Sequence, residues 1–233
     1  MTTMLKPVEQ LKGRLVVSCQ ARPGNPVKGP RFMSAFACAA ELGGAGGIRA
    51  NGPADIRAIR KVCSLPIIGI NKWRQAAWPV YITPTLASAR SIRNAGADII
   101  AIDATHRPRR GGLTPEQLIA AIHAELGCAV MADIDSINEG YAAARAGADL
   151  VATTLSGYTL TGYTGQAPSP GPDLDLLRAL ACALDVPVIC EGRIWSPQDV
   201  AAAFSAGAYA VVVGTAITNP MEITRHFVTG IHN

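Results

Sequence analysis

Two chemically reactive side chains each stand at the end of an apolar stretch. The stretch "LPIIGINK" (65–72) is mostly apolar until it reaches Asn71 and Lys72, and "VPVICEG" (186–192) carries Glu191 near its end. A lysine and a carboxylate on different walls of one pocket could do acid–base chemistry on a small substrate. The same lysine could instead form a Schiff base with a carbonyl group. Either chemistry requires a fold that brings the ends of these stretches together.

Other polar residues also end strand-like stretches, and none interrupts the middle of one. If the strands are parallel, their ends meet at one rim, where partly buried charges need partners or a function. In chain order these residues are Gln20, Arg49, Lys72, Asp103, Asp133, Thr153 with Thr154, Glu191 and the turn Gly214–Thr215. The candidates for the chemistry itself are Lys72, Glu191, Asp133 and Arg49.

Two glycine-containing turns predict a phosphate site. The segments "VICEGRI" (188–194) and "VVVGTAITNP" (211–220) would end the last two strands of a barrel, the usual position of phosphate sites in that fold. Gly192 and Gly214 would let backbone N–H groups approach a phosphate, and Arg193 or Thr215 could add donors. No Walker-type or G-x-G-x-x-G loop is present, so nucleotide binding is not expected.

Composition and the remaining reactive residues narrow the class of protein. The chain is 49% hydrophobic and carries a net charge of +4 with scattered basic residues, which predicts a globular core and no nucleic-acid or membrane-binding tract. The four histidines lack metal-ligand spacing and none is placed for a Ser-His-Asp triad. Six cysteines without a C-x-x-C pair favour reduced thiols in a cytoplasmic protein. We expect no signal peptide and no membrane-spanning run.

A repeated pattern of helix, glycine and strand predicts the architecture. In each repeat an alanine-rich helix stops at glycine, which fits a left-handed helix end, and a β-branched strand follows. Four strands of a second type alternate with the repeats, so eight strands are separated by helical segments. The repeats are 94–105, 145–156, 205–216 and a looser one at 41–52, and the other strands are 14–20, 65–72, 128–134 and 186–192.

Eight such units in 233 residues suit a (β/α)8 TIM barrel, an α/β fold, better than an open sheet. We see no linker, so residues 1–233 are expected to form a single domain of the phosphate-binding type. The loop 156–173 is too long for an ordinary connection and could cover a substrate.

Several motifs at the strand ends, in the same order and with similar spacing, resemble the N-acetylmannosamine-6-phosphate 2-epimerase family. The resemblance runs from about residue 12 to 228. Its most specific motifs are "GIRANG" and "TTLSGYT", because other phosphate-binding barrels have motifs similar to "EGRI" and "VGTAI". The motifs are "VVSCQA", "GGAGGIRANG", "LPIIGINK", "PVYITPT", "AGADIIAIDATHR", "MADI", "TTLSGYT", "VPVICEGRI" and "AVVVGTAI".

The resemblance implies a TIM-barrel isomerase that interconverts N-acetylmannosamine 6-phosphate and N-acetylglucosamine 6-phosphate in sialic-acid and aminosugar catabolism. It implies that Lys72 is the acid/base at carbon 2 and that Glu191 is its carboxylate counterpart. It also implies a homodimer, and neither a metal nor another cofactor. The implied substrate-binding residues are Gln20, Arg49, Asp133 and Thr154, and the implied phosphate-binding residues are Gly192, Arg193, Gly214 and Thr215.

Two segments leave questions open. After Lys72 the family usually continues with a charged loop that contains acidic residues, whereas this chain reads "WRQAAW" (73–78). The two tryptophans of this segment could close the pocket or pack on a neighbouring subunit, and we expect the packing. We expect "THRPRR" (105–110) to be a solvated loop rather than a phosphate contact. A Schiff-base aldolase acting through Lys72 and a non-catalytic phosphosugar-binding barrel remain the alternative functions. The sequence leaves open whether one or two groups transfer the proton at carbon 2.

Overall fold

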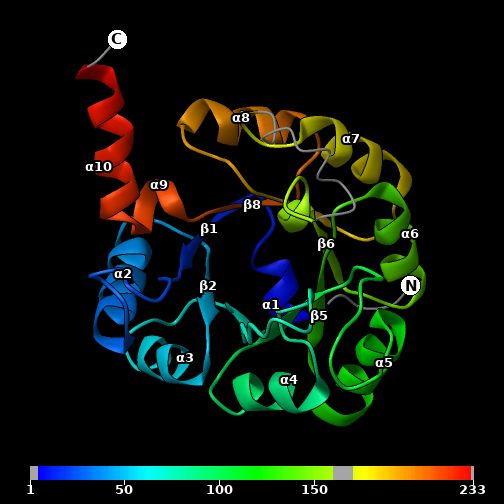
Figure 1. Ribbon diagram of the computed structural model, residues 1–233. Helices are drawn as coiled ribbons and strands as arrows, with labels where there is room; N and C mark the ends of the chain where they lie inside the picture. The colour runs from blue at the N-terminus through cyan, green and yellow to red at the C-terminus, as the bar shows by residue number, and fades with distance from the viewer. Residues whose placement is uncertain (1–4, 160–169, 232–233) are drawn as a thin grey trace.

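The structure is a computed structural model that describes residues 5–159 and 170–231. Eight parallel strands close into a barrel in chain order, with β8 beside β1, and helices surround it (Figure 1). The predicted (β/α)8 architecture is confirmed, whereas the single domain over residues 1–233 stays a prediction. The strands are β1 Arg14–Cys19, β2 Gly47–Asn51, β3 Ile67–Ile70, β4 Ile99–Asp103, β5 Ala129–Asp133, β6 Leu150–Ala152, β7 Val188–Glu191 and β8 Ala210–Val213.

Local sequence signals fix where several helices begin. Proline occupies the first position of α5 and of α8, and Thr114 and Ser196 cap these helices with reciprocal capping boxes. The helices are α1 Lys6–Glu9, α2 Pro30–Leu42, α3 Pro53–Arg60, α4 Leu86–Arg93, α5 Pro115–Leu126, α6 Ile137–Arg145, α7 Leu174–Ala183, α8 Pro197–Ser205, α9 Thr215–Thr218 and α10 Pro220–Val228, with short 3-10 turns at Thr153–Leu155 and Thr229–Ile231.

The glycines of the sequence repeats take the backbone conformation that the pattern predicts. Gly96 and Gly147 lie between a helix and the next strand with φ of +109° and +91°. Most side chains rarely adopt positive φ, so glycine allows the chain to leave the helix and enter the strand within a few residues.

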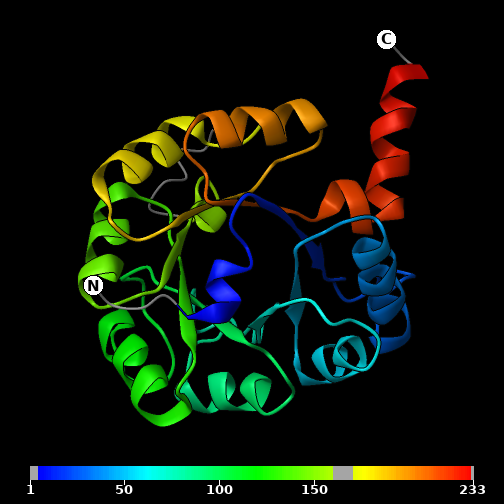
Figure 2. The ribbon, with the colours of Figure 1, turned by 180° about the vertical axis from the view of Figure 1, so that it is seen from behind.

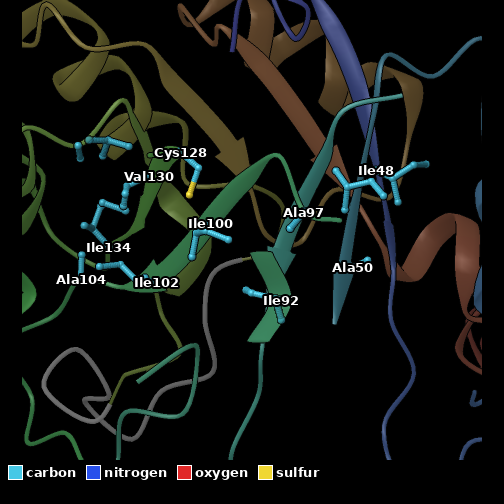
Figure 3. Packing of buried hydrophobic residues seen from close by; sticks show 14 of the residues in the cluster. Ile48, Ala50, Ile92, Ala97, Ile100, Ile102, Ala104, Cys128, Val130 and Ile134 are labelled. Atoms are coloured by element: carbon cyan, nitrogen blue, oxygen red, sulfur yellow. The ribbon is translucent and has the colours of Figure 1, made fainter. Parts of the chain in front are cut away.

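Alternate residues of each strand build two separate apolar layers. One set faces the helices, as with Ile48, Ile100 and Val130, and Figure 3 shows part of this outer layer. The other set fills the barrel interior and packs with Val8 and Leu11. The segment around α1, which carries these two residues, lies across the end of the barrel seen from behind (Figure 2). Because strand side chains alternate with period two, the sequence position of a residue decides which layer it joins.

The last helix, α10, projects away from the barrel (Figures 1 and 2). None of its residues is buried, and Phe227 and, just beyond it, Ile231 each expose 74% of their surface. The ring of His226 stacks on Trp195 with centroids 4.9 Å apart. Within the described part of the chain, no helix has the length and apolar character needed to cross a bilayer.

Candidate active site

The predicted site residues occupy the next inward positions after the apolar interior of their strands. In β3, Ile68 and Ile70 face the interior, so Lys72 follows on the same side. The same count of two leads from Met131 to Asp133 in β5 and from Ile189 to Glu191 in β7. Alternation also places Gln20, Arg49, Thr154 and Gly214 on the interior side. The carboxyl ends of the strands therefore converge as predicted.

Arg49 is the centre of this rim. Its side chain is fully buried, and its guanidinium binds Asp133 through two hydrogen bonds, Nη1 to Oδ1 at 3.0 Å and Nη2 to Oδ2 at 2.5 Å. Nη1 also donates to Glu191 Oε2 at 2.5 Å. Both carboxylates raise the pKa of Arg49 against the opposing effect of its burial, so it stays charged. Arg49 thus joins strands β2, β5 and β7.

The groups around the Glu191 carboxyl shift its pKa in opposite directions. Burial raises its pKa, and Asp133 adds to that effect, while the cations Arg49 and Lys72 and the Thr154 hydroxyl lower it. The net direction is upward from the ordinary value. A carboxyl group in this environment takes up a proton more readily than an exposed one.

Lys72 stands at the open mouth of the barrel. Its residue surface is exposed, although the surrounding walls remove enough water to lower its pKa to about 8, and the charge of Arg49 adds to that effect. Glu191 opposes the shift, whereas Arg74 and Arg22 lower the pKa further. Because water reaches the exposed side chain, we expect part of this shift to develop only when a substrate covers it. A lysine with such a pKa is neutral often enough to act as a base.

Asn51, which is not among the residues predicted from the sequence, positions the backbone of Lys72. Its side-chain Oδ1 accepts a hydrogen bond from the Lys72 backbone N–H at 2.8 Å. Asn51 follows Arg49 by two residues in β2, so the alternation that placed Arg49 at the rim could have found it. The segment after Lys72 turns back as an antiparallel hairpin, with bridges from Lys72 to Ile82 and from Gln75 to Trp78.

The tip of this hairpin rests on the β4–α5 loop. Arg110 lies over the Trp73 ring at 3.9 Å and donates to Gln75 Oε1 at 3.1 Å. Trp73 and Trp78 expose 40% and 37% of their surface. The "WRQAAW" segment is therefore half-covered by its own chain at the edge of the mouth.

The expectation of a solvated 105–110 loop is wrong for two of its arginines. Arg107 Nη2 donates to the buried Asp103 at 2.7 Å, and Arg109, 7% exposed, donates to the Thr105 carbonyl at 2.6 Å. Asp103 is fully buried and also accepts from the Thr105 hydroxyl. Asp103 therefore acts as the internal anchor of this loop.

The predicted phosphate residues divide into two groups. Gly192 and Gly214 follow the neighbouring strands β7 and β8, whose register pairs Glu191 with Val212. A side chain on Gly214 would come within 3.2 Å of Ser18 Cβ, so this backbone approaches β1 closely. Thr215 is exposed at the start of α9. Gly192 and Gly214 are partly exposed, so both turns lie at the surface.

Arg193 is held differently. Its Nε donates to the Gly171 carbonyl at 2.7 Å and its Nη1 to the Ser156 carbonyl at 2.6 Å. It has a φ of +55°, which is uncommon for a residue other than glycine. Arg193 thus ties together the two ends of the predicted long loop, whose residues 160–169 lie outside those described. Gln20 donates from its Nε2 to Ser18 Oγ, and its buried Oε1 has no partner among the residues that the structure describes.

A cavity of about 430 Å³ lies at the opposite end of the barrel, near the starts of β7 and β8. Its charged lining residues are Lys12 and Asp185, and the rest of the lining is largely apolar. Its position does not coincide with the converging ion pairs, so we assign the candidate site from the arrangement of charges. Among residues 5–159 and 170–231, no three His, Cys, Asp or Glu side chains group as metal ligands.

A closed parallel barrel with a hydrogen-bonded network of arginine and carboxyl side chains at the carboxyl ends of its strands defines a (β/α)8 protein of the enzymatic type. The family model described as "Putative N-acetylmannosamine-6-phosphate epimerase" matches residues 33–233. The chain belongs to this family.

Similar proteins cover nearly the whole chain. A protein of Caldanaerobacter subterraneus subsp. tengcongensis, named as a putative N-acetylmannosamine-6-phosphate 2-epimerase, is 49% identical over 96% of this chain and 93% of its own. One of the same name from Cutibacterium acnes is 46% identical over 94% of both chains. The structure of the N-acetylmannosamine-6-phosphate 2-epimerase from Clostridium perfringens superposes with a TM-score of 0.91, at 41% identity and 98% coverage of both chains. A thiamine phosphate pyrophosphorylase from Pyrococcus furiosus, at 16% identity and a TM-score of 0.61, shares the fold.

Proposed function

We propose that the protein is an N-acetylmannosamine-6-phosphate 2-epimerase that acts in aminosugar and sialic-acid catabolism. Family membership and the solved relative support the reaction type. The observation that carries the proposal for this chain is the network that joins Arg49 to Asp133 and Glu191, with Lys72 electrostatically linked to the same network.

Lys72 is the proposed base at carbon 2. Epimerisation beside a carbonyl removes a weakly acidic C–H proton and returns a proton on the opposite face, and the opened sugar aldehyde accepts the electron pair. The pKa of Lys72, lowered to about 8, supports a neutral amine at working pH. After it takes the proton, the ammonium stabilises the enolate charge.

Glu191 is the proposed partner of Lys72. Its pKa is raised by burial, so it can hold a proton while Lys72 is neutral, and the pair can exchange one proton without a change in total charge. Two routes fit this pair. Lys72 and Glu191 could each serve one face of carbon 2, or Lys72 could serve both faces while Glu191 balances its charge.

The hydrogen bonds of Arg49 and Asp133 are directed mainly to each other, to Glu191 and to Thr154. These two residues are therefore proposed to orient the sugar indirectly, by positioning Glu191 and Thr154. Gln20, with its unpartnered buried Oε1, is the proposed direct sugar contact. Backbone groups of Gly192 and Gly214 and the hydroxyl of Thr215 are the proposed phosphate contacts, with Arg193 supporting them. Arg22 and Arg74, whose charges act on Lys72, would attract an anionic substrate to the mouth.

The test is incubation with N-acetylmannosamine 6-phosphate in deuterated water. We expect NMR to show that the gluco epimer forms and carries deuterium at carbon 2. Lys72→Ala and Glu191→Ala should each abolish turnover while circular dichroism reports a folded barrel. No epimer at high enzyme concentration would refute the proposed function.

The alternatives give different results in the same assay. An aldolase acting through a Schiff base at Lys72 would be inactivated covalently by borohydride in the presence of substrate, and an epimerase would remain unmodified. A non-catalytic binding barrel would bind the phosphosugar and exchange no deuterium. Family membership and the solved relative favour the epimerase over both alternatives.

The predicted homodimer is proposed to use α10. This helix has no buried residue, and the exposed Phe227 and Ile231 give it an apolar surface that a second copy could cover. Sedimentation should give a dimer, and Phe227→Asp should shift it toward monomer. The free state of all six cysteines supports the proposed cytoplasmic location.

A further inference from the structure

The hydroxyl group of Thr154 lies between two carboxylates of the candidate site. Its Oγ1 is 2.7 Å from Asp133 Oδ1 and 3.2 Å from Glu191 Oε2. Both distances are within hydrogen-bonding range, and Arg49 Nη1 approaches the same oxygen at 3.4 Å. Thr154 is half-buried, in the short turn that follows β6.

The hydrogens at this point can be counted. Arg49 Nη1 carries two hydrogens, which are directed to Asp133 Oδ1 and Glu191 Oε2. Thr154 has one hydroxyl hydrogen and two acceptors in reach. With both carboxylates ionised, Thr154 can donate to only one of them. When Glu191 carries a proton, Glu191 can donate to Thr154 and Thr154 can donate to Asp133, so both contacts of Thr154 Oγ1 are hydrogen bonds.

We propose that Thr154 is a positioning residue that holds Glu191 in both of its protonation states by reversing its hydrogen bond to that carboxyl group. Thr154 donates to the ionised Glu191 and accepts from the protonated one. The hydroxyl only rotates about its C–O bond, so no proton leaves Thr154 and no alkoxide forms. This role replaces the predicted direct contact between Thr154 and the sugar, and it rests on the proposed function of Glu191.

The groups around Glu191 favour this role for Thr154. Arg49 from β2, Asp133 from β5 and Lys72 after β3 are the charged groups that act on the carboxyl. Arg49 is fixed by two carboxylates and can only donate, and Asp133 as a carboxylate can only accept. Among these neighbours of Glu191, Thr154 alone carries a hydroxyl, which can change between donor and acceptor. Thr153, one residue earlier, contacts the backbone of Glu191 instead, through its N–H and carbonyl.

The test compares Thr154→Val, which removes the hydroxyl at nearly constant shape, with Thr154→Ser, which keeps it. A ¹³C-carboxyl NMR titration, assigned with Glu191→Gln, follows Glu191 directly and needs no turnover. Thr154→Val removes a hydrogen bond from both forms of Glu191, and the bond to the ionised form is the stronger one. We therefore expect the titration of Glu191 to move upward in Thr154→Val and to stay at the wild-type position in Thr154→Ser. We expect kcat to fall about tenfold in Thr154→Val, as for loss of a hydrogen bond to a charged group, with little change in KM.

Three outcomes would overturn the inference. They are an unchanged Glu191 titration in Thr154→Val, a raised KM with unchanged kcat, or a Thr154→Ser variant that behaves like Thr154→Val. If Thr154→Val does not fold by circular dichroism, Thr154→Ala replaces it in the same titration. The proposed function fails separately, when the wild type forms no epimer. In that case the titration still decides whether Thr154 controls Glu191.

Discussion

Asp133→Ala should destabilise the protein strongly, because it removes the main counter-ion of a buried cation. Arg49 and Asp133 have side chains with no exposed surface, and two hydrogen bonds join them. Removing one member of a buried pair costs about 3–5 kcal/mol. Glu191 still binds Arg49 at 2.5 Å, so we expect the lower end, about 3 kcal/mol. That loss corresponds to roughly a 140-fold smaller folding equilibrium constant.

Urea unfolding monitored by circular dichroism measures this loss as a lower midpoint at an unchanged slope. Asp175→Ala is the matched control, because Asp175 is 97% exposed and pairs with Arg178 on the surface at 3.0 Å. We expect the control to unfold at the wild-type midpoint. Equal midpoints for Asp133→Ala and Asp175→Ala would refute the view that Arg49 depends on Asp133.

Three other predictions follow from the site and the core. The kcat of the wild type should rise with pH to a plateau with a midpoint near pH 8, because kcat reports the substrate-covered enzyme, in which the neutral amine of Lys72 forms as pH passes its lowered pKa. A midpoint near the ordinary value of 10.5 would contradict this. Asn51→Ala should lower kcat by about tenfold or more, because it displaces Lys72. Asn51→Asp keeps the acceptor, and its negative charge should move the midpoint of the pH profile upward. An unchanged pH profile in both variants would argue against the contact. Gly140→Ala, which ordinarily favours a helix, should destabilise by about 1–3 kcal/mol because its Cβ would collide with Leu180. Gly230→Ala, with no atom within 4 Å of the added Cβ, is its control in thermal unfolding.

The fold was largely predictable, because barrel strands and helices leave local signals. Proline at the first helical turn, glycine before a strand and continuous apolar strands identified the repeating unit. Lys72 and Glu191 were predictable by the same reasoning, since a charge that ends an apolar strand stands out. Their roles as catalytic residues stay predictions.

The pairing within the site was not predictable. Arg49 meets Asp133 and Glu191 across 84 and 142 residues of sequence, and that contact depends on the register of three strands. The sequence does not reveal that Arg107 is held by Asp103, four residues earlier, because the burial of Asp103 is a property of the closed barrel. The outward position of α10 likewise depends on packing that no local pattern records.

The tryptophans make the intrinsic fluorescence of this protein sensitive to changes at the mouth of the barrel. All three, Trp73, Trp78 and Trp195, lie in segments that follow β3 and β7, and the barrel core contains none. Trp73 lies beneath Arg110, and Trp195 stacks on His226 of α10. The intrinsic fluorescence of the native protein therefore arises from the rim and from the contact with α10. Its emission would respond to ligand entry or subunit association before it responded to loss of the barrel.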